Sequence, residues 1–79
     1  MPKVMFGPVY DDGTIFRCVA SADGRGRVEI WNPSLRSWEP SSWSVEALHA
    51  KPFPSDEVFE RLGVPASDRV IATGSRRPR

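Results

Sequence analysis

The chain has little of the chemistry from which catalytic and metal sites are built. It contains one cysteine, Cys18, and one histidine, His49, in 79 residues. A single cysteine excludes an internal disulfide, and a structural zinc site needs several Cys or His side chains at set spacing. The glycine-containing run Asp23-Gly-Arg-Gly26 lacks the lysine and the strand–loop–helix frame of a phosphate-binding loop. We therefore expect no metal and no cofactor.

Long hydrophobic runs are also absent. No apolar stretch approaches the roughly 20 residues that a membrane-spanning helix needs. The first eight residues carry a single charge and an apolar stretch interrupted by prolines, which is unlike a secretory signal. We expect a cytoplasmic protein without a membrane partner.

Size and composition predict one small folded domain. The chain is 39% hydrophobic and 27% charged, and its net charge is +1. Disordered chains have fewer aromatic residues and a larger net charge. Eight prolines indicate short elements separated by turns. The last six residues, Gly74-Ser-Arg-Arg-Pro-Arg79, are basic, so we expect a domain over residues 1–73 and a basic flexible tail over 74–79.

The first forty residues are typical of an antiparallel β-meander. Residues rich in β-branched and aromatic side chains alternate with turn signals such as Asp11-Asp-Gly13 and Asn32-Pro-Ser. Pro8 cannot donate to a strand ladder, which indicates that the first strand lies at an edge. The predicted strands cover residues 4–10, 14–20, 27–31 and a short return at 37–39 that stops before Pro40.

Two registers are open for the second and third strands. A three-residue loop at Asp23-Gly-Arg25 would pair Cys18 with Ile30, and it would place Arg17 beside Trp31. A two-residue loop would instead pair Cys18 with Glu29. We favour the first register, because it separates apolar from polar side chains on the two faces of the sheet.

After Pro40 the pattern changes to helix. Ser44 can cap a short helix over 45–50, and a second helix over 55–63 begins at a serine and ends at Gly63. Its apolar stripe, Val58, Phe59 and Leu62, should cover the open face of the sheet. Residues 68–73 could add a last edge strand or form an extended tail. The predicted fold class is therefore α+β: a three- to four-stranded meander with one or two short helices packed on one face.

Catalytic candidates are few. Cys18 lies in a strand-like run, where it is expected to act as a small buried hydrophobe, and pairing it with His49 as a base is the sole nucleophilic arrangement available. The carboxylate pair Asp11–Asp12 lies in a turn, where both groups should be solvated. We expect that the protein is not an enzyme.

The concentration of tryptophan is the most distinctive feature of the chain. Trp31, Trp38 and Trp43 fall within thirteen residues. Such a cluster either closes a small core or forms a binding surface, because an indole combines a large apolar area with one N–H donor. Interaction hot spots are enriched in Trp and Arg, and the candidate partner-binding residues are accordingly Trp31, Trp38, Arg17, Arg27 and Arg36.

Part of this region resembles the second and third strands of WW domains. The resemblance covers about fifteen residues, from Gly26 to Pro40, and aligns Trp38 and Pro40 with the C-terminal Trp and Pro of that family. It implies a meander that presents Trp31 and Trp38 on one side as a platform for proline rings. The chain departs from the family at Glu29, where a ligand-facing tyrosine is usual, and in a turn two residues shorter.

Two functions follow as hypotheses. The first is a non-catalytic protein-interaction or regulatory module that binds another protein through an exposed Trp/Arg surface; a homodimer formed through an edge strand is a variant of it. The second is nucleic-acid binding, in which the aromatic rings stack on bases and Arg76, Arg77 and Arg79 contact phosphates. The near-neutral net charge favours the first, since a dedicated nucleic-acid binder generally has a basic face.

Overall fold

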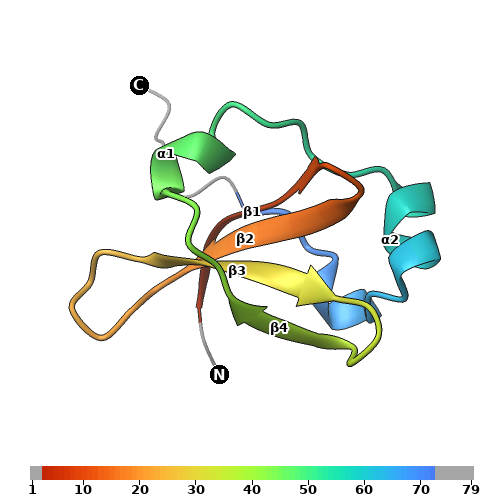
Figure 1. Ribbon diagram of the computed structural model, residues 1–79, viewed down its shortest axis with the longest axis horizontal. Coiled ribbons are helices and arrows are strands. Elements are labelled where there is room, and N and C mark those ends of the chain that lie inside the picture. Colours follow the sequence, from red (N-terminus) through yellow and green to blue (C-terminus); the bar gives the residue numbers. More distant parts are fainter. Residues whose placement is uncertain (1–2, 73–79) are drawn as a thin grey trace.

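The computed structural model describes residues 3–72. Four strands form one antiparallel sheet in the order β1-β2-β3-β4, so the chain is a meander (Figure 1). The elements, in chain order, are β1 (Val4–Asp11), β2 (Thr14–Val19), β3 (Arg27–Asn32), β4 (Ser37–Pro40), α1 (Val45–Leu48), α2 (Asp56–Leu62) and the 3-10 helix η1 (Ala66–Asp68). The predicted α+β fold class is confirmed, and β1, which contains Pro8, lies at an edge as expected.

The first hairpin forms where the turn signal predicted it. Asp11 pairs with Thr14 across a two-residue loop, and the loop residues Asp12 and Gly13 have φ angles of 53° and 82°. Two positive φ values in succession define the turn that matches the right-handed twist of the flanking strands. Aspartate and glycine tolerate this conformation better than most residues, which explains the turn from the sequence alone.

The predicted register of the second hairpin is wrong by two residues. Cys18 pairs with Val28, not Ile30, and Arg17 lies opposite Glu29, not Trp31. The loop is longer than expected because side chains organise it: Ser21 Oγ accepts from Gly26 N at 3.0 Å, and Asp23 Oδ1 accepts from Arg25 N at 3.0 Å. An even shift keeps every side chain on its predicted face.

Both predicted helices are present with their expected N-caps. The Ser44 side chain accepts from Ala47 N in α1, and the Ser55 side chain accepts from Val58 N in α2. Gly63 ends α2 with φ 72°, and its N–H bonds back to helix carbonyls. Local capping chemistry therefore fixes both ends of α2.

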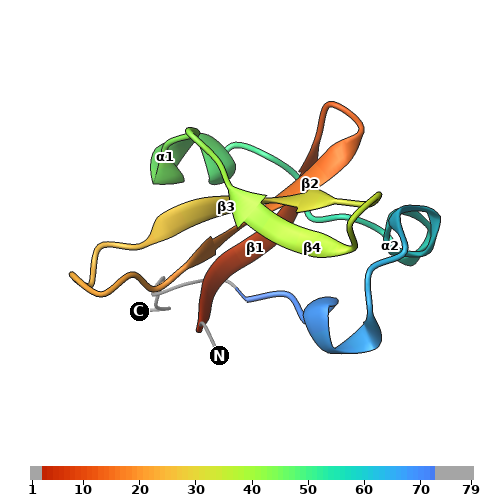
Figure 2. The same ribbon diagram turned by 60° about the horizontal axis from the view of Figure 1, so that its bottom comes forward.

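The two helices contribute to the apolar clusters on opposite faces of the sheet. One cluster joins Leu48 of α1 to buried side chains of β1, β2 and β3: Phe6, Val9, Phe16, Cys18 and Val28. The other joins Phe59 and Leu62 of α2 to Ile15, Trp31 and Val64. In Figure 2 α1 lies above the sheet and η1 below it. The α2 stripe does cover a sheet face, as the sequence predicts, and α1 covers the other.

Residues 68–72 do not form the regular edge strand considered from the sequence. Residue 68 ends η1, and the chain meets β1 through one isolated bridge, in which Gly7 and Ala72 exchange N–H···O bonds of 2.8 and 2.7 Å. Tyr10 N also donates to Pro52 O. These contacts cover part of the outer edge of β1. Thr73 and the predicted basic tail, 74–79, lie outside the described residues.

Candidate functional site

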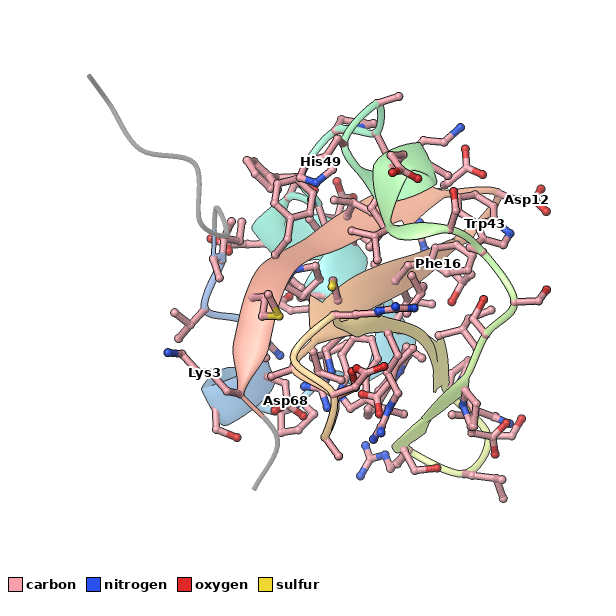
Figure 3. All side chains as sticks on the ribbon, turned by 90° about the vertical axis from the view of Figure 1, so that its left-hand side faces the viewer. Lys3, Asp12, Phe16, Trp43, His49 and Asp68 are labelled. Atoms are coloured by element: carbon pink, nitrogen blue, oxygen red, sulfur yellow. The ribbon has the colours of Figure 1, made fainter. Side chains whose placement is uncertain are left out.

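The three tryptophans have separate surroundings. Trp31 is 2% exposed, and its indole N–H donates to Leu62 O at 2.8 Å. Trp38 is half-buried on the same face, with the ring centroids 5.2 Å apart. Trp43 is half-buried on the opposite face, where it stacks on Phe16 at 4.2 Å, and Figure 3 shows these two rings together.

Trp31 is therefore a core residue, which corrects the expectation that its ring lies on the binding surface. The α2 stripe covers it, and the last turn of α2 supplies the acceptor for its N–H. A proline-binding platform made by Trp31 and Trp38 together, as the resemblance to WW domains implied, is not present. Of the two rings, only that of Trp38 keeps part of its surface accessible to a partner.

Arg17 is also buried, which corrects its expected place on an open surface. Its exposed fraction is 7%, and both its Nε and its NH2 lie 2.9 Å from Glu29 Oε1. Its NH1 lies 3.8 Å from Asp68 Oδ1. A buried guanidinium needs such a partner, because an unpaired charge in a low-dielectric interior is very unfavourable. Arg17 thus supports the site from beneath.

Trp38 is held from three directions by this network. The Arg17 guanidinium lies 4.2 Å from the centre of the Trp38 ring, and Trp38 Nε1 donates to Asp68 Oδ2 at 3.2 Å. The Trp31 and Trp38 rings pack against each other in a T-shaped arrangement with an interplanar angle of 63°. A ring fixed in this way loses little conformational entropy when a partner covers its open part.

Two further predicted binding residues, Arg27 and Arg36, are at the surface. The Arg27 side chain is 55% exposed, with NH2 3.6 Å from Glu29 Oε2. Arg36 is exposed in the β3–β4 turn and has a φ of 54°. Asn32 shapes that turn, since its Oδ1 accepts from Ser34 N and Leu35 N. Leu35, next to Arg36, is 65% exposed.

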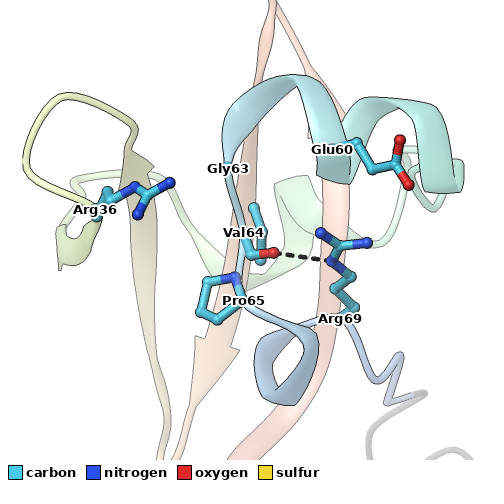
Figure 4. A pocket seen from close by; sticks show the side chains of 6 residues that line it. All are labelled: Arg36, Glu60, Gly63, Val64, Pro65 and Arg69. Carbon is cyan, nitrogen blue, oxygen red and sulfur yellow. Dashed lines mark hydrogen bonds between the residues drawn. The ribbon is translucent and has the colours of Figure 1, made fainter.

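A pocket of about 530 Å³ opens beside Arg36. It lies between the β3–β4 turn, the C-terminal end of α2 and the segment that leads through η1 (Figure 4). Arg69 is fixed there by a 2.8 Å hydrogen bond from its Nε to Val64 O. The lining residues are Arg36, Glu60, Gly63, Val64, Pro65 and Arg69.

The structure thus brings together residues that the sequence did not single out. Asp68 orients Trp38, and Arg69 lines the pocket, yet both belong to a segment considered as a possible strand. No local pattern marks them, because their roles depend on the return of the chain beneath the sheet after Gly63. Charge at 68–69 was visible in the sequence, but its partners were not.

The other candidates have different surroundings. Cys18 is 1% exposed, and burial raises the pKa of its thiol above the ordinary value, opposed by a smaller effect of a backbone hydrogen bond from Arg27. A nucleophilic thiolate requires the reverse environment. His49 is exposed and its ring lies 4.1 Å from that of Phe6. Asp12 is exposed, and Asp11 forms an ion pair with Lys51 at 3.2 Å.

Within residues 3–72, no group of three or more His, Cys, Asp or Glu side chains is placed to hold a metal ion. None of the helices there has the length and apolar character needed to cross a membrane. Arg76, Arg77 and Arg79, the expected nucleic-acid contacts, lie outside the described residues.

Comparison with protein-family models, curated proteins and solved structures found no match to this chain. The features of the chain that point to a function are the geometry around Trp38 and the pocket beside Arg36.

Proposed function

We propose that the chain is a cytoplasmic, non-catalytic protein-interaction module whose contact surface is centred on Trp38 and Arg36. The observation that carries the proposal is the fixed, half-buried ring of Trp38, with the Arg17 guanidinium against it and Asp68 on its N–H. Tryptophan and arginine dominate interaction hot spots, and rigid aromatic side chains bind at low entropic cost.

The surroundings of Trp38 support a protein partner. Leu35 and Arg36 project from the adjacent turn, and a pocket with polar and apolar walls lies beside them. An aromatic anchor, an exposed aliphatic side chain and an arginine together make the mixed surface that protein interfaces use. Arg27 lies further along β3 and would extend this surface with a second exposed guanidinium.

The adjacent sheet edge is open within the described residues. Hydrogen bonds at Gly7 and Tyr10 occupy part of the outer side of β1, whereas β4 pairs with β3 alone. Ser41 N donates to Val28 O, so the alternation of the ladder directs the N–H and C=O of Trp38 away from β3. An extended partner segment could pair there. The edge is four residues long and ends at Pro40, which limits indiscriminate self-pairing.

Selection from displayed libraries of peptides and natural protein fragments tests the proposal. Trp38→Phe removes the indole N–H and part of the exposed ring, and Trp43→Phe makes the same change on the opposite face. We expect the wild-type protein to enrich binders that Trp38→Phe loses and Trp43→Phe keeps, with both variants folded by circular dichroism. An absence of enriched binders, or a loss confined to Trp43→Phe, contradicts the proposal.

Two competing functions, nucleic-acid binding and self-association, can be tested with the same purified protein. Binding to single-stranded DNA or RNA that weakens steeply with salt, and that exceeds binding to the selected fragments, would indicate nucleic-acid recognition instead. Sedimentation across a range of concentrations tests association through β4. We expect a monomer that binds the selected fragments at low ionic strength without binding nucleic acid.

A further inference from the structure

Arg36 occupies a backbone conformation that normally belongs to glycine or asparagine. Its φ of 54° lies in the left-handed region, at the position where the β3–β4 turn rejoins β4. A long side chain there is strained, because its Cβ crowds the neighbouring carbonyl oxygen. Such outliers cluster at functional sites. Glycine would form this turn with less strain. The presence of arginine therefore indicates a role for its guanidinium group.

The guanidinium of Arg36 lies at the pocket wall. A Cβ built on Gly63 would lie 3.5 Å from Arg36 NH2, an ordinary contact distance, so the Arg36 guanidinium lies close to the C-terminal end of α2. Arg69 lines the same pocket, and in Figure 4 the two guanidiniums lie on either side of residues 63–65. The space between them spans the buried Val64 and the exposed Pro65.

The two arginines of the pocket have no ion pair among the described residues. Among residues 3–72, neither Arg36 nor Arg69 has a carboxylate oxygen within 4.0 Å, whereas Arg17, Arg25 and Arg27 each do. Glu60 also lines the pocket but forms no ion pair with either arginine. Arg69 donates its Nε–H to Val64 O, its guanidinium lies 6.0 Å from the centre of the Phe59 ring, and its terminal nitrogens form no hydrogen bond within residues 3–72.

The balance of charge favours a carboxylate over a dense polyanion. Two guanidiniums and one carboxylate give the pocket a formal charge of about +1, and the partial negative charge at the C-terminal end of α2 reduces it further. A nucleic-acid backbone carries a negative charge on every nucleotide, and the Glu60 carboxylate in the pocket wall repels such charge. A guanidinium binds a carboxylate in a planar, two-bonded arrangement, and a peptide leaves its other groups neutral.

We infer that this pocket binds an acidic side chain, Asp or Glu, of the partner's peptide segment, which crosses residues 63–65 between Arg36 and Arg69. The inference rests on the proposed function and names the chemistry of its partner. Trp38 supplies the apolar anchor, and the pocket supplies selectivity for a negatively charged residue beside it.

Nuclear magnetic resonance of the arginine side chains tests the inference with a defined probe. The probe is an acetylated, amidated octapeptide of alternating serine and glutamate, and the control peptide has glutamine in place of glutamate. We expect the glutamate peptide to shift the Nε–Hε signals of Arg36 and Arg69 along one saturable curve, with the Arg25 signal unchanged. Equal shifts with the glutamine peptide, or no shift at either arginine, overturn the inference.

Matched variants separate binding from folding. Arg36→Gly should weaken binding of the glutamate peptide at least tenfold while the melting temperature stays equal or rises. Arg25→Gly removes an exposed arginine from another turn and should change the affinity less than twofold. Arg69→Lys keeps the charge but loses the planar fork, so binding should weaken severalfold. Unchanged affinity in Arg36→Gly overturns the inference.

The inference and the proposed function can fail separately. Selected fragments that depend on Trp38 but lack acidic residues would overturn the carboxylate pocket and leave the interaction module standing. Glutamate-specific shifts at Arg36 and Arg69 without any Trp38-dependent binder would overturn the interaction module and leave the carboxylate pocket standing. A twelve-nucleotide thymidine strand that shifts the same two signals at lower concentration than the glutamate peptide would indicate a phosphate site and overturn the inference.

Discussion

The guanidinium of Arg17 lies 4.2 Å from the centre of the Trp38 ring while it is paired with Glu29 beneath the sheet surface. A buried ion pair thus packs against a half-buried aromatic side chain. Because the pair lies directly opposite in the β2–β3 register, any change to it acts on the sheet and on Trp38 together.

Removing one member of this pair should lower the free energy of unfolding much more than removing both members. Arg17→Leu leaves the Glu29 carboxylate buried with only the more distant Arg27, and we expect it to lower the free energy of unfolding by about 3 kcal/mol. The double variant Arg17→Leu/Glu29→Leu should recover most of that loss. Urea unfolding measures all four proteins of the cycle. A single variant as stable as the wild type would show that the pair is not needed.

Cys18 should make stability depend on alkaline pH. Burial raises the pKa of its thiol above the ordinary value of 9.0, so the unfolded chain loses the thiol proton first as pH rises. The folded state then binds more protons than the unfolded state, and the stabilisation is full below that value and lost as pH rises through the folded pKa. Unfolding measured from about pH 8 to about pH 10.5 should show a steeper decline for the wild type than for Cys18→Ala. Parallel curves would contradict this expectation.

Two glycines with positive φ should respond differently to alanine. At Gly13, with φ 82°, nothing lies within 4 Å of an added Cβ, so Gly13→Ala should cost only the left-handed strain of about 1 kcal/mol. At Gly7, with φ 98°, the added Cβ would lie 3.1 Å from Phe16 O and 3.2 Å from Arg17 Cα. Both are backbone atoms of the neighbouring strand, so Gly7→Ala should cost about 2 kcal/mol more. Thermal unfolding of both variants checks the order, and equal costs would refute it.

Arg36→Gly should stabilise the protein although it removes a side chain. Relief of the left-handed strain exceeds the added entropy of an unfolded glycine, so we expect a gain of about 0.5 kcal/mol. Arg25 has no positive φ, and Arg25→Gly should therefore lower stability slightly. Chemical denaturation resolves this difference in sign. A loss in both variants would mean that the Arg36 side chain contributes to folding.

The sequence predicts the elements of this fold well where local chemistry determines them. The Asp12-Gly13 turn, the Ser55 cap and the Gly63 end of α2 all follow from side chains within a few residues of each feature. The faces of β2 and β3 are also correct, because alternation depends on the period of the strand and not on the loop. The register is off by two residues because the loop is centred on Asp23 and not on Gly24, and hydrogen bonds to Ser21 and Asp23 hold it there.

The site was less predictable because its burial is decided by tertiary contacts. Trp31 and Trp38 look equivalent in the sequence, but α2 packs over Trp31 and its Leu62 carbonyl takes the indole N–H. The sequence alone does not distinguish Arg17 from an exposed arginine on a strand, because its partner Glu29 is known only once the register is known. Asp68 and Arg69 reach the site only through the return of the chain beneath the sheet. The contacts Trp31–Leu62 and Trp38–Asp68 join residues about thirty positions apart, and no periodic pattern in the sequence indicates contacts at that separation.

Fluorine resonance of the protein labelled with 5-fluorotryptophan tests the central claim most directly. Three signals report Trp31, Trp38 and Trp43, each assigned by its own Trp→Phe variant. When a selected binding fragment is added, we expect the Trp38 signal to shift in proportion to occupancy while the Trp43 signal stays in place. A shift at Trp43 with Trp38 unmoved would place the contact on the opposite face and contradict the account.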